Sequence, residues 1–272
     1  MRDLFGRSWL ILVFAFLYLP IGCLVVFSFT AGELTTQLDG VSLRWYASLA
    51  GDAELRSAVA LSLTLACAAA SAAVLIGGVA ALGLRRFGPL PGRGLLAAML
   101  SVPMVLPEVV IGLSLVLLFT HPWLPWLGGR GVVAIWVAHT TLCVAYVTVL
   151  VDSRLAETDP ALEEAARVLG CPPLKACFVI TVPVIVPALL SGWLLAFTLS
   201  MDDFVLAGML SDPGSTTLPV LVFARLHHGL KPDINALASV IVALVSIAVL
   251  IFHVLQRSSR RRERARALRR EG

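Results

Sequence analysis

The sequence predicts an all-α membrane protein with six transmembrane helices, and its composition, apolar run lengths and lack of strand patterning all support this fold class. Of the 272 residues, 58% are hydrophobic and only 14% are charged, whereas soluble domains carry about 25% charged residues. Six apolar runs are long enough to cross a hydrocarbon core of roughly 30 Å, and none alternates as a barrel strand does. Because lipid offers the backbone no hydrogen-bond partners, we expect these runs to be helices.

The positive charges orient these predicted helices in the membrane. The helices are expected at residues 9–29, 57–83, 96–120, 131–151, 178–201 and 234–255. With the N-terminus inside, sixteen of the 21 Lys and Arg residues fall on the cytoplasmic side, where positive charge accumulates in membrane proteins. We therefore expect cytoplasmic termini, a transmembrane domain over residues 1–256, and a basic cytoplasmic tail over 257–272 that can contact anionic lipid headgroups.

The third predicted helix carries a glutamate and two prolines at membrane depth. Glu108 lies 13 residues beyond Leu95, roughly 20 Å along a continuous helix, and a charge at that depth is costly. Pro103 and Pro107 remove helix hydrogen bonds just before it, so a kink is expected there. Two interpretations stay open: Glu108 lines an aqueous path, or it is a protonated carboxyl bonded to a carbonyl that the prolines leave free.

The fifth predicted helix ends on two adjacent carboxylates, Asp202 and Asp203. About 33 Å of helix separates them from Ile180, which places them at the outer mouth. Neighbouring helical residues project about 100° apart, so one carboxylate can face the path while the other caps or pairs with Arg or Lys. We expect at least one to attract a cation, with structural pairing as the alternative. In the fourth helix, His139 is expected to hydrogen-bond another helix rather than relay protons.

The loop over residues 202–233 contains an apolar run at 218–223 that is too short to span a bilayer. Thr216 and Thr217 precede it and can cap a helix. A short interfacial helix that gates a pore and a plain surface connector are both compatible with this pattern.

The cytoplasmic loop over residues 153–183 carries start and stop signals of a short helix. Asp159 can cap its beginning and Pro160 suits the first helical position. Gly170 suits a left-handed exit, and Pro172 with Pro173 prevents continuation. These signals predict a helix of about ten residues that projects into the cytoplasm.

The expected helix has two different faces. One face consists of small and apolar side chains, namely Leu162, Ala165, Ala166 and Leu169. The other face carries charges that can pair at i,i+3 and i,i+4 spacing, namely Glu163, Glu164 and Arg167. A small apolar face on a projecting helix indicates a docking element that inserts into a cleft of another protein.

Enzymatic readings of the chain find no support in its motifs. Only two residues separate Glu164 from Arg167, one too few for the Glu-Glu-x-x-x-Arg signature of an intramembrane protease. No GxxxxGK[ST] loop for nucleotide phosphates occurs either. A secondary transporter built from two similar halves is also disfavoured, because the chain has no internal repeat. We therefore expect no catalytic residue, no metal and no cofactor, and a half-transporter that pairs with another chain.

One motif in this loop resembles that of a known family. The spacing of Glu164, Ala165, Ala166, Gly170, Ile180 and Pro183 resembles the EAA motif of permease subunits of binding-protein-dependent ABC importers. Val182 stands where the motif usually has Leu, which keeps an apolar residue before the proline. The resemblance implies the type I ABC importer permease fold, with this loop docking into a groove of a separate ATPase subunit that hydrolyses ATP.

The wider chain, from about residue 8 to 255, is similar to the putrescine and spermidine permeases of that family. The stretches that carry this resemblance are "GLSLVLLF", "SGWLLAFTLSMDDFVLAGML", "PGSTTLPVLVF" and "INALAS". The resemblance implies a bacterial inner-membrane protein whose partners are ABC ATPase subunits, a second related permease, an external substrate-binding protein and membrane lipid, without nucleic acid. Iron, an amino acid or another amine remains the alternative substrate, and a secondary transporter or an intramembrane protease is the alternative class.

Overall fold

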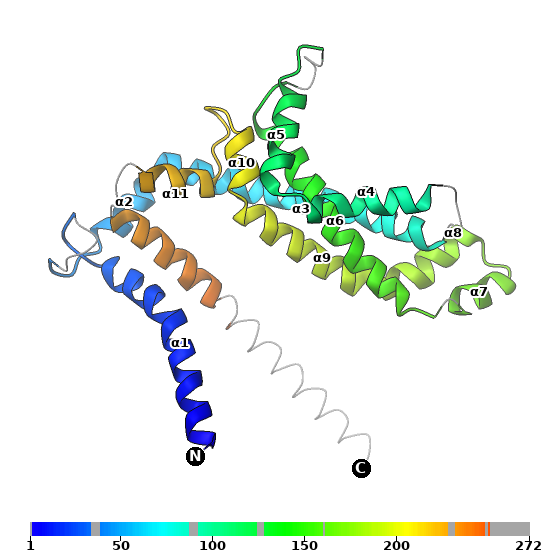
Figure 1. Ribbon diagram of the computed structural model, residues 1–272, viewed down its shortest axis with the longest axis horizontal. Coiled ribbons are helices and arrows are strands. Elements are labelled where there is room, and N and C mark those ends of the chain that lie inside the picture. The colour runs from blue at the N-terminus through cyan, green and yellow to red at the C-terminus, as the bar shows by residue number, and fades with distance from the viewer. Residues whose placement is uncertain are drawn as a thin grey trace. The chain divides into compact units, whose positions relative to one another are not determined.

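The computed structural model describes a helical chain (Figure 1), with one isolated β-bridge between Thr30 and Val41 among the residues that it covers. The described residues are 2–33, 39–86, 92–123, 128–159, 161–227, 232–247 and 250. Their helices are α1 (Arg2–Phe27), α2 (Arg44–Gly51), α3 (Ala53–Arg86), α4 (Arg93–Val105), α5 (Glu108–Phe119), α6 (Val132–Ala156), α7 (Ala161–Val168), α8 (Pro173–Ala176), the π-helix η2 (Cys177–Thr181), α9 (Val182–Asp202), α10 (Val205–Leu210), α11 (Leu218–His227) and an apolar helix at Pro232–Ile247.

The chain divides into two compact units, of which residues 54–221 form the larger one. In this unit α3, α6 and α9 pack around one core, and Figure 1 shows α6 and α9 running side by side. Small residues allow the close packing that transmembrane helices use in place of a hydrophobic driving force. A Cβ added at Gly77 of α3 would lie 3.1 Å from the carbonyl oxygen of Val144 in α6.

The third predicted helix is broken, so the expectation of a single kinked helix over 96–120 is wrong. Helices α4 and α5 meet at an angle of 109°. Leu106 is extended at ψ 140° and Pro107 at ψ 134°, because a proline disfavours the helical conformation of the residue before it and cannot donate its own helix hydrogen bond. The depth of roughly 20 Å expected for Glu108 along one straight helix therefore does not apply.

Among the described residues, four helices are long and apolar enough to cross a membrane, and a fifth span results if the bent α4–α5 pair counts as one. They are residues 6–27 of α1, α3, α6, and the α8–η2–α9 run Pro173–Asp202. The described part of the sixth predicted helix is Pro232–Ile247, and the rest of it and the tail over 257–272 lie outside the described residues. The six-span count and the cytoplasmic termini stay predictions.

A second core of the larger unit holds α5, α6 and α10 together. Buried side chains of all three helices meet in it, among them Ile111, Ile135 and Leu206. Helices α5 and α10 approach closely at Gly112, where an added Cβ would lie 2.7 Å from the Met209 sulfur. This core fixes the segment that follows the Asp202–Asp203 pair.

The smaller unit comprises residues 1–53 and 222–272. The Trp45 indole Nε1 donates to the Thr30 carbonyl over 2.9 Å, and Ser28 Oγ lies 2.6 Å from the Tyr46 hydroxyl. Arg225 Nη2 lies 2.7 Å from Asp52 Oδ2. These contacts connect the end of α1 to α2, and the end of α2 to α11.

Candidate functional site

The helix predicted in the cytoplasmic loop is confirmed as α7, Ala161–Val168. Asp159 Oδ1 accepts the Ala161 amide over 2.9 Å, which satisfies one of the free donors at the helix start. At its end Gly170 has φ +87°, and the Cys171 amide donates to the Ala166 carbonyl over 3.0 Å. This left-handed exit is the geometry expected of the glycine.

The motif residues of this loop lie mostly on its surface. Glu164, Ala165 and Gly170 are exposed and Ala166 is half-buried. Beside them, the apolar side chains of Val168 and Leu169 are each 88% exposed. Because a soluble surface rarely leaves adjacent large apolar side chains uncovered, the end of α7 is a candidate contact surface.

The two remaining motif residues lie where the loop returns toward the membrane. Ile180 is half-buried within η2 and lines a cavity beneath α7. Pro183 is exposed near the start of α9, where α9 continues directly from η2, so its missing N–H removes one hydrogen bond from the helical run.

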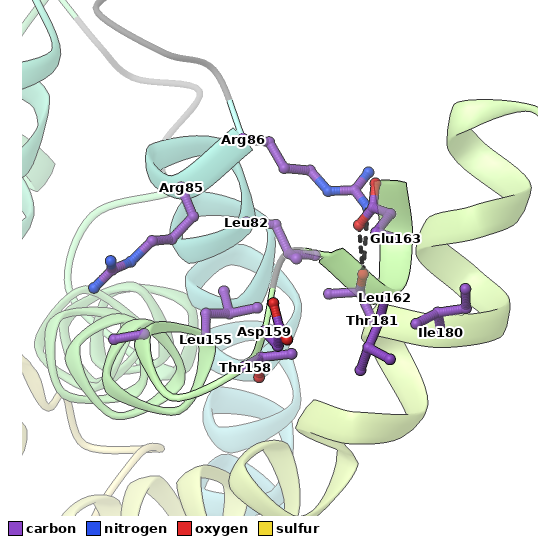
Figure 2. A pocket seen from close by; sticks show the side chains of 11 residues that line it. Leu82, Arg85, Arg86, Leu155, Thr158, Asp159, Leu162, Glu163, Ile180 and Thr181 are labelled. Carbon is purple, nitrogen blue, oxygen red and sulfur yellow. Dashed lines mark hydrogen bonds and ion pairs between the residues drawn. The ribbon is translucent and has the colours of Figure 1, made fainter. Parts of the chain in front are cut away.

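The two glutamates of α7 face different surroundings. The expected single charged face of Glu163, Glu164 and Arg167 is therefore wrong for Glu163. Glu163 does not form its ion pair with Arg167 along the helix. Its carboxylate pairs with Arg86 at the end of α3 and accepts a hydrogen bond from the Thr181 hydroxyl over 2.7 Å. Figure 2 shows these two contacts, with Arg85 pointing away toward the other side. Helix α7 therefore turns Glu163 toward its own chain and leaves Glu164 to solvent.

The surroundings of Glu163 favour its charged form. Partial burial opposes ionisation, but the hydrogen bonds from Thr181 and Arg86 and the charges of Arg86 and Arg167 outweigh it. The pKa of Glu163 consequently lies below its ordinary value.

A cavity of about 310 Å³ lies between α7 and the membrane helices (Figure 2). Its walls come from the ends of α3 and α6, from α7 and from η2, with lining residues Leu82, Arg85, Arg86, Leu155, Ala156, Thr158, Asp159, Leu162, Glu163, Ile180 and Thr181. Helix α7 therefore does not pack tightly on the helices above it.

The carboxylates at the end of α9 divide into one exposed and one buried group. Asp202 is exposed, whereas Asp203 is 8% exposed and its Oδ1 accepts the amides of Leu206 and Ala207 over 2.8 and 3.1 Å. Asp203 thus satisfies free donors at the start of α10. The expected capping role is confirmed for Asp203, and Asp202 is the exposed carboxylate of the pair.

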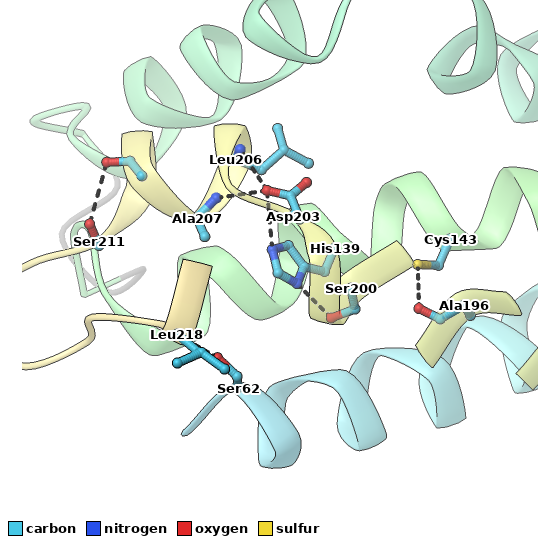
Figure 3. A network of polar contacts seen from close by, with 11 residues as sticks. Ser62, His139, Cys143, Ala196, Ser200, Asp203, Leu206, Ala207, Ser211 and Leu218 are labelled. Carbon is cyan, nitrogen blue, oxygen red and sulfur yellow. Dashed lines mark hydrogen bonds and ion pairs between the residues drawn. The ribbon is translucent and has the colours of Figure 1, made fainter. Parts of the chain in front are cut away.

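His139 connects α6 to the same region (Figure 3). Its Nδ1 lies 2.7 Å from Ser200 Oγ in α9, which confirms the expected hydrogen bond between helices. Its Nε2 faces Asp203 Oδ1 at 3.8 Å and has no hydrogen-bond partner within the described chain.

Glu108 is the first residue of α5, where a negative charge complements the helix dipole. Its side chain is exposed in this chain. Glu108 lies close enough to Asp202 and Asp203 for both aspartate charges to act on it. The structure therefore gathers three carboxylates from two distant stretches of sequence at the α5, α9 and α10 ends.

These polar groups do not form a metal centre. Across the described ranges, no group of three or more His, Cys, Asp or Glu side chains could hold a metal ion. Sequence reasoning missed Arg86, Thr181 and Ser200, because their partners lie between 18 and 95 residues away along the chain and no spacing rule reports such a pairing.

Comparisons with known proteins place this arrangement in a family. Residues 73–265 match the model of the binding-protein-dependent transport system inner membrane component. The chain is 49% identical over 259 residues to the putrescine transport system permease protein PotI of Escherichia coli K12, covering 94% of this chain and 92% of the relative. It is 33% identical over 258 residues to the spermidine/putrescine transport system permease protein PotC of Haemophilus influenzae, covering 95% and 98%.

A solved structure shares the fold. One chain of a bacterial alginate ABC transporter, crystallised in complex with an alginate pentasaccharide-bound periplasmic protein, superposes with a TM-score of 0.73 at 17% identity, covering 92% of this chain and 93% of that one. The expected type I ABC importer permease fold is therefore confirmed. Several apolar helices, the matched family model and the two permease relatives agree, and this chain belongs to the multi-pass inner membrane components of binding-protein-dependent transport systems.

Proposed function

We propose that this chain is a permease subunit that forms half of the translocation path for a polyamine, with putrescine as the first candidate. The observation that carries this proposal is the 49% identity to a putrescine permease across nearly the whole length of both proteins. The carboxylates at the α5 and α9 ends give independent support, because negative charge along a path attracts an organic dication.

Within this path, Glu108 and Asp202 are the groups that attract the solute. Both side chains are exposed, and the charge of Asp202 acts on Glu108. Asp203 is committed to the amides of α10, so its contribution is to hold the α9–α10 junction in place.

The ATP-driven step reaches the chain through its cytoplasmic loop. Glu164, Ala165, Ala166 and Gly170 form the contact with an ABC ATPase subunit, while Ile180 and Pro183 set the return into α9. Closure of an ATPase pair would displace α7 and shift the transmembrane helices as rigid bodies between two states. A second related permease completes the path, and a periplasmic binding protein delivers the solute.

The test is reconstitution of the complete transporter in proteoliposomes, with its ATPase, second permease and candidate binding proteins. We expect the chain to co-purify with the ATPase, and labelled putrescine on its binding protein to stimulate ATP hydrolysis and enter the vesicles. Spermidine, an amino acid and iron are supplied in parallel with their own binding proteins. Import of one of these without putrescine import would overturn the substrate, and import that survives ATP depletion but collapses with an ionophore would overturn the class.

A further inference from the structure

Three side chains from separate helices meet at one carboxylate oxygen beneath α7. Glu163 Oε2 pairs with Arg86 and accepts the Thr181 hydroxyl over 2.7 Å, while Arg86 Nη2 lies 3.4 Å from Thr181 Oγ1. We refer to Arg86, Glu163 and Thr181 as the Glu163 cluster. The side chains of Arg86 and Glu163 are 28% and 21% exposed, so water screens their attraction less than that of a surface pair.

The cluster joins α7 to two long apolar helices at their ends. Arg86 is the last residue of α3, and Thr181 is the last residue of η2, where the π-helix passes into α9. A π-helical turn inserts an extra residue into a helix and is frequent at functional positions. A displacement of Glu163 would therefore act on α3 and on the irregular turn of α9 together.

Helix α7 also packs against α8 and η2, the segments that follow it in the chain, but its polar connections are few. Within the described part of the chain, the polar side-chain contacts from α7 to α3 and η2 are those of Glu163. A cavity of about 310 Å³, lined from α7 by Leu162 and Glu163, lies between the start of α7 and the helix ends. Gly170, at the far end of α7, has no atom within 4 Å of an added Cβ. Without Glu163, a displacement of α7 would act on α3 through no polar side-chain contact among the described residues, and on α9 only through the neighbouring segments α8 and η2.

We propose that Glu163 is a positioning residue that transmits displacement of α7 to α3 and α9 through Arg86 and Thr181. This inference rests on the proposed coupling function of the loop and adds a connection inside the permease itself. Glu164 and Glu163 then act in sequence: Glu164 on the outer surface meets the ATPase, and Glu163 on the inner surface moves the membrane helices. Loss of Glu163 would leave ATPase docking intact and separate hydrolysis from transport.

The experiment measures ATP hydrolysed and putrescine imported by the same reconstituted complex. We expect Glu163→Gln to lower import per ATP by about tenfold, the factor that one charge-assisted hydrogen bond typically contributes. Thr181→Val, which removes one hydroxyl, should also lower import per ATP, but by a smaller factor. The charge exchange Arg86→Glu with Glu163→Arg should restore the ratio to within about twofold of the unmodified chain, because it rebuilds the ion pair.

Glu157→Gln is the matched control. Glu157 pairs with Arg154 over 2.8 Å in the same loop, but both side chains are well exposed, and neither reaches α3 or α9 in the contacts described. This variant should keep the unmodified ratio. Co-purification of the ATPase and the thermal midpoint of the complex, measured for every variant, separate a transmission defect from a loss of assembly.

The outcomes distinguish this inference from the proposed function. Absence of putrescine import by the unmodified complex would overturn the substrate, and the ratio would then be measured with whichever solute is imported. An unchanged ratio in Glu163→Gln would overturn the inference. If Glu163→Gln does not assemble, Thr181→Val decides: a lowered ratio supports the inference and an unchanged one overturns it.

Discussion

Asp203 and His139 face each other in the interior of the chain, with Asp203 Oδ1 3.8 Å from His139 Nε2. Both residues are buried: Asp203 is 8% exposed and His139 is 2% exposed. The same Oδ1 of Asp203 also accepts hydrogen bonds from two backbone amides of α10. Through these hydrogen bonds Asp203 holds the junction between α9 and α10. Its neighbour Asp202 is exposed.

Substitutions at the two aspartates should therefore affect different properties: stability for Asp203 and uptake for Asp202. Asp203→Ala leaves the amides of Leu206 and Ala207 without an acceptor, and should destabilise the protein by about 1–3 kcal/mol. Asp202→Asn should leave stability unchanged and reduce putrescine uptake. Thermal unfolding in detergent and uptake in proteoliposomes measure the two effects; a stability loss in Asp202→Asn that matches Asp203→Ala would contradict this assignment.

Glu108 should matter for transport and little for folding. Glu108→Gln removes a charge from an exposed side chain at the start of α5, so the thermal midpoint should change little, while uptake of a dication should fall severalfold. Raising the salt concentration should narrow the difference, because ions screen exposed charges. Glu33→Gln is the control, since Glu33 is also exposed, pairs only distantly with Arg44 at 3.9 Å, and lies in the other unit. Equal uptake by both variants would count against a role for Glu108.

Gly170 ends α7 because its backbone adopts a left-handed conformation. Its φ of +87° is unfavourable for other residues by roughly 1–2 kcal/mol, yet a Cβ would meet no atom within 4 Å. Gly170→Val should therefore alter the end of α7 and lower import per ATP hydrolysed, whereas Gly170→Asn, which tolerates this conformation, should stay near the unmodified value. If both variants lower import per ATP hydrolysed by the same factor, the added bulk at the docking surface is the cause and the backbone conformation is not.

Acid should loosen α7 through Glu163. Its pKa is lowered in the folded chain, so its contribution to stability is fully present above the ordinary value of 4.5 and is lost as pH falls through the lower folded value. We expect faster amide hydrogen exchange in residues 161–168 in that acidic range, after correction for the intrinsic pH dependence of exchange. Glu163→Gln should remove this pH dependence, and an equally strong dependence in that variant would show that another group is responsible.

Much of this protein was determined by the sequence alone. Long apolar runs predict spanning helices because lipid requires internal backbone hydrogen bonds, and α1, α3, α6 and α9 follow. The caps and the glycine around 159–170 act locally, so α7 could be placed together with its surface residues Glu164, Ala165 and Gly170.

Only the tertiary structure decided how the polar groups are used. The sharp turn at Pro107 combines with the packing of α5 on α10 to bring Glu108 near Asp202, and local sequence does not encode that meeting. Asp202 and Asp203 are chemically identical, and their different roles follow from which one the α10 amides reach. Glu163 was expected to pair along its own helix, but Arg86, 77 residues earlier in the chain, lies beside it in space and offers a less solvent-screened partner.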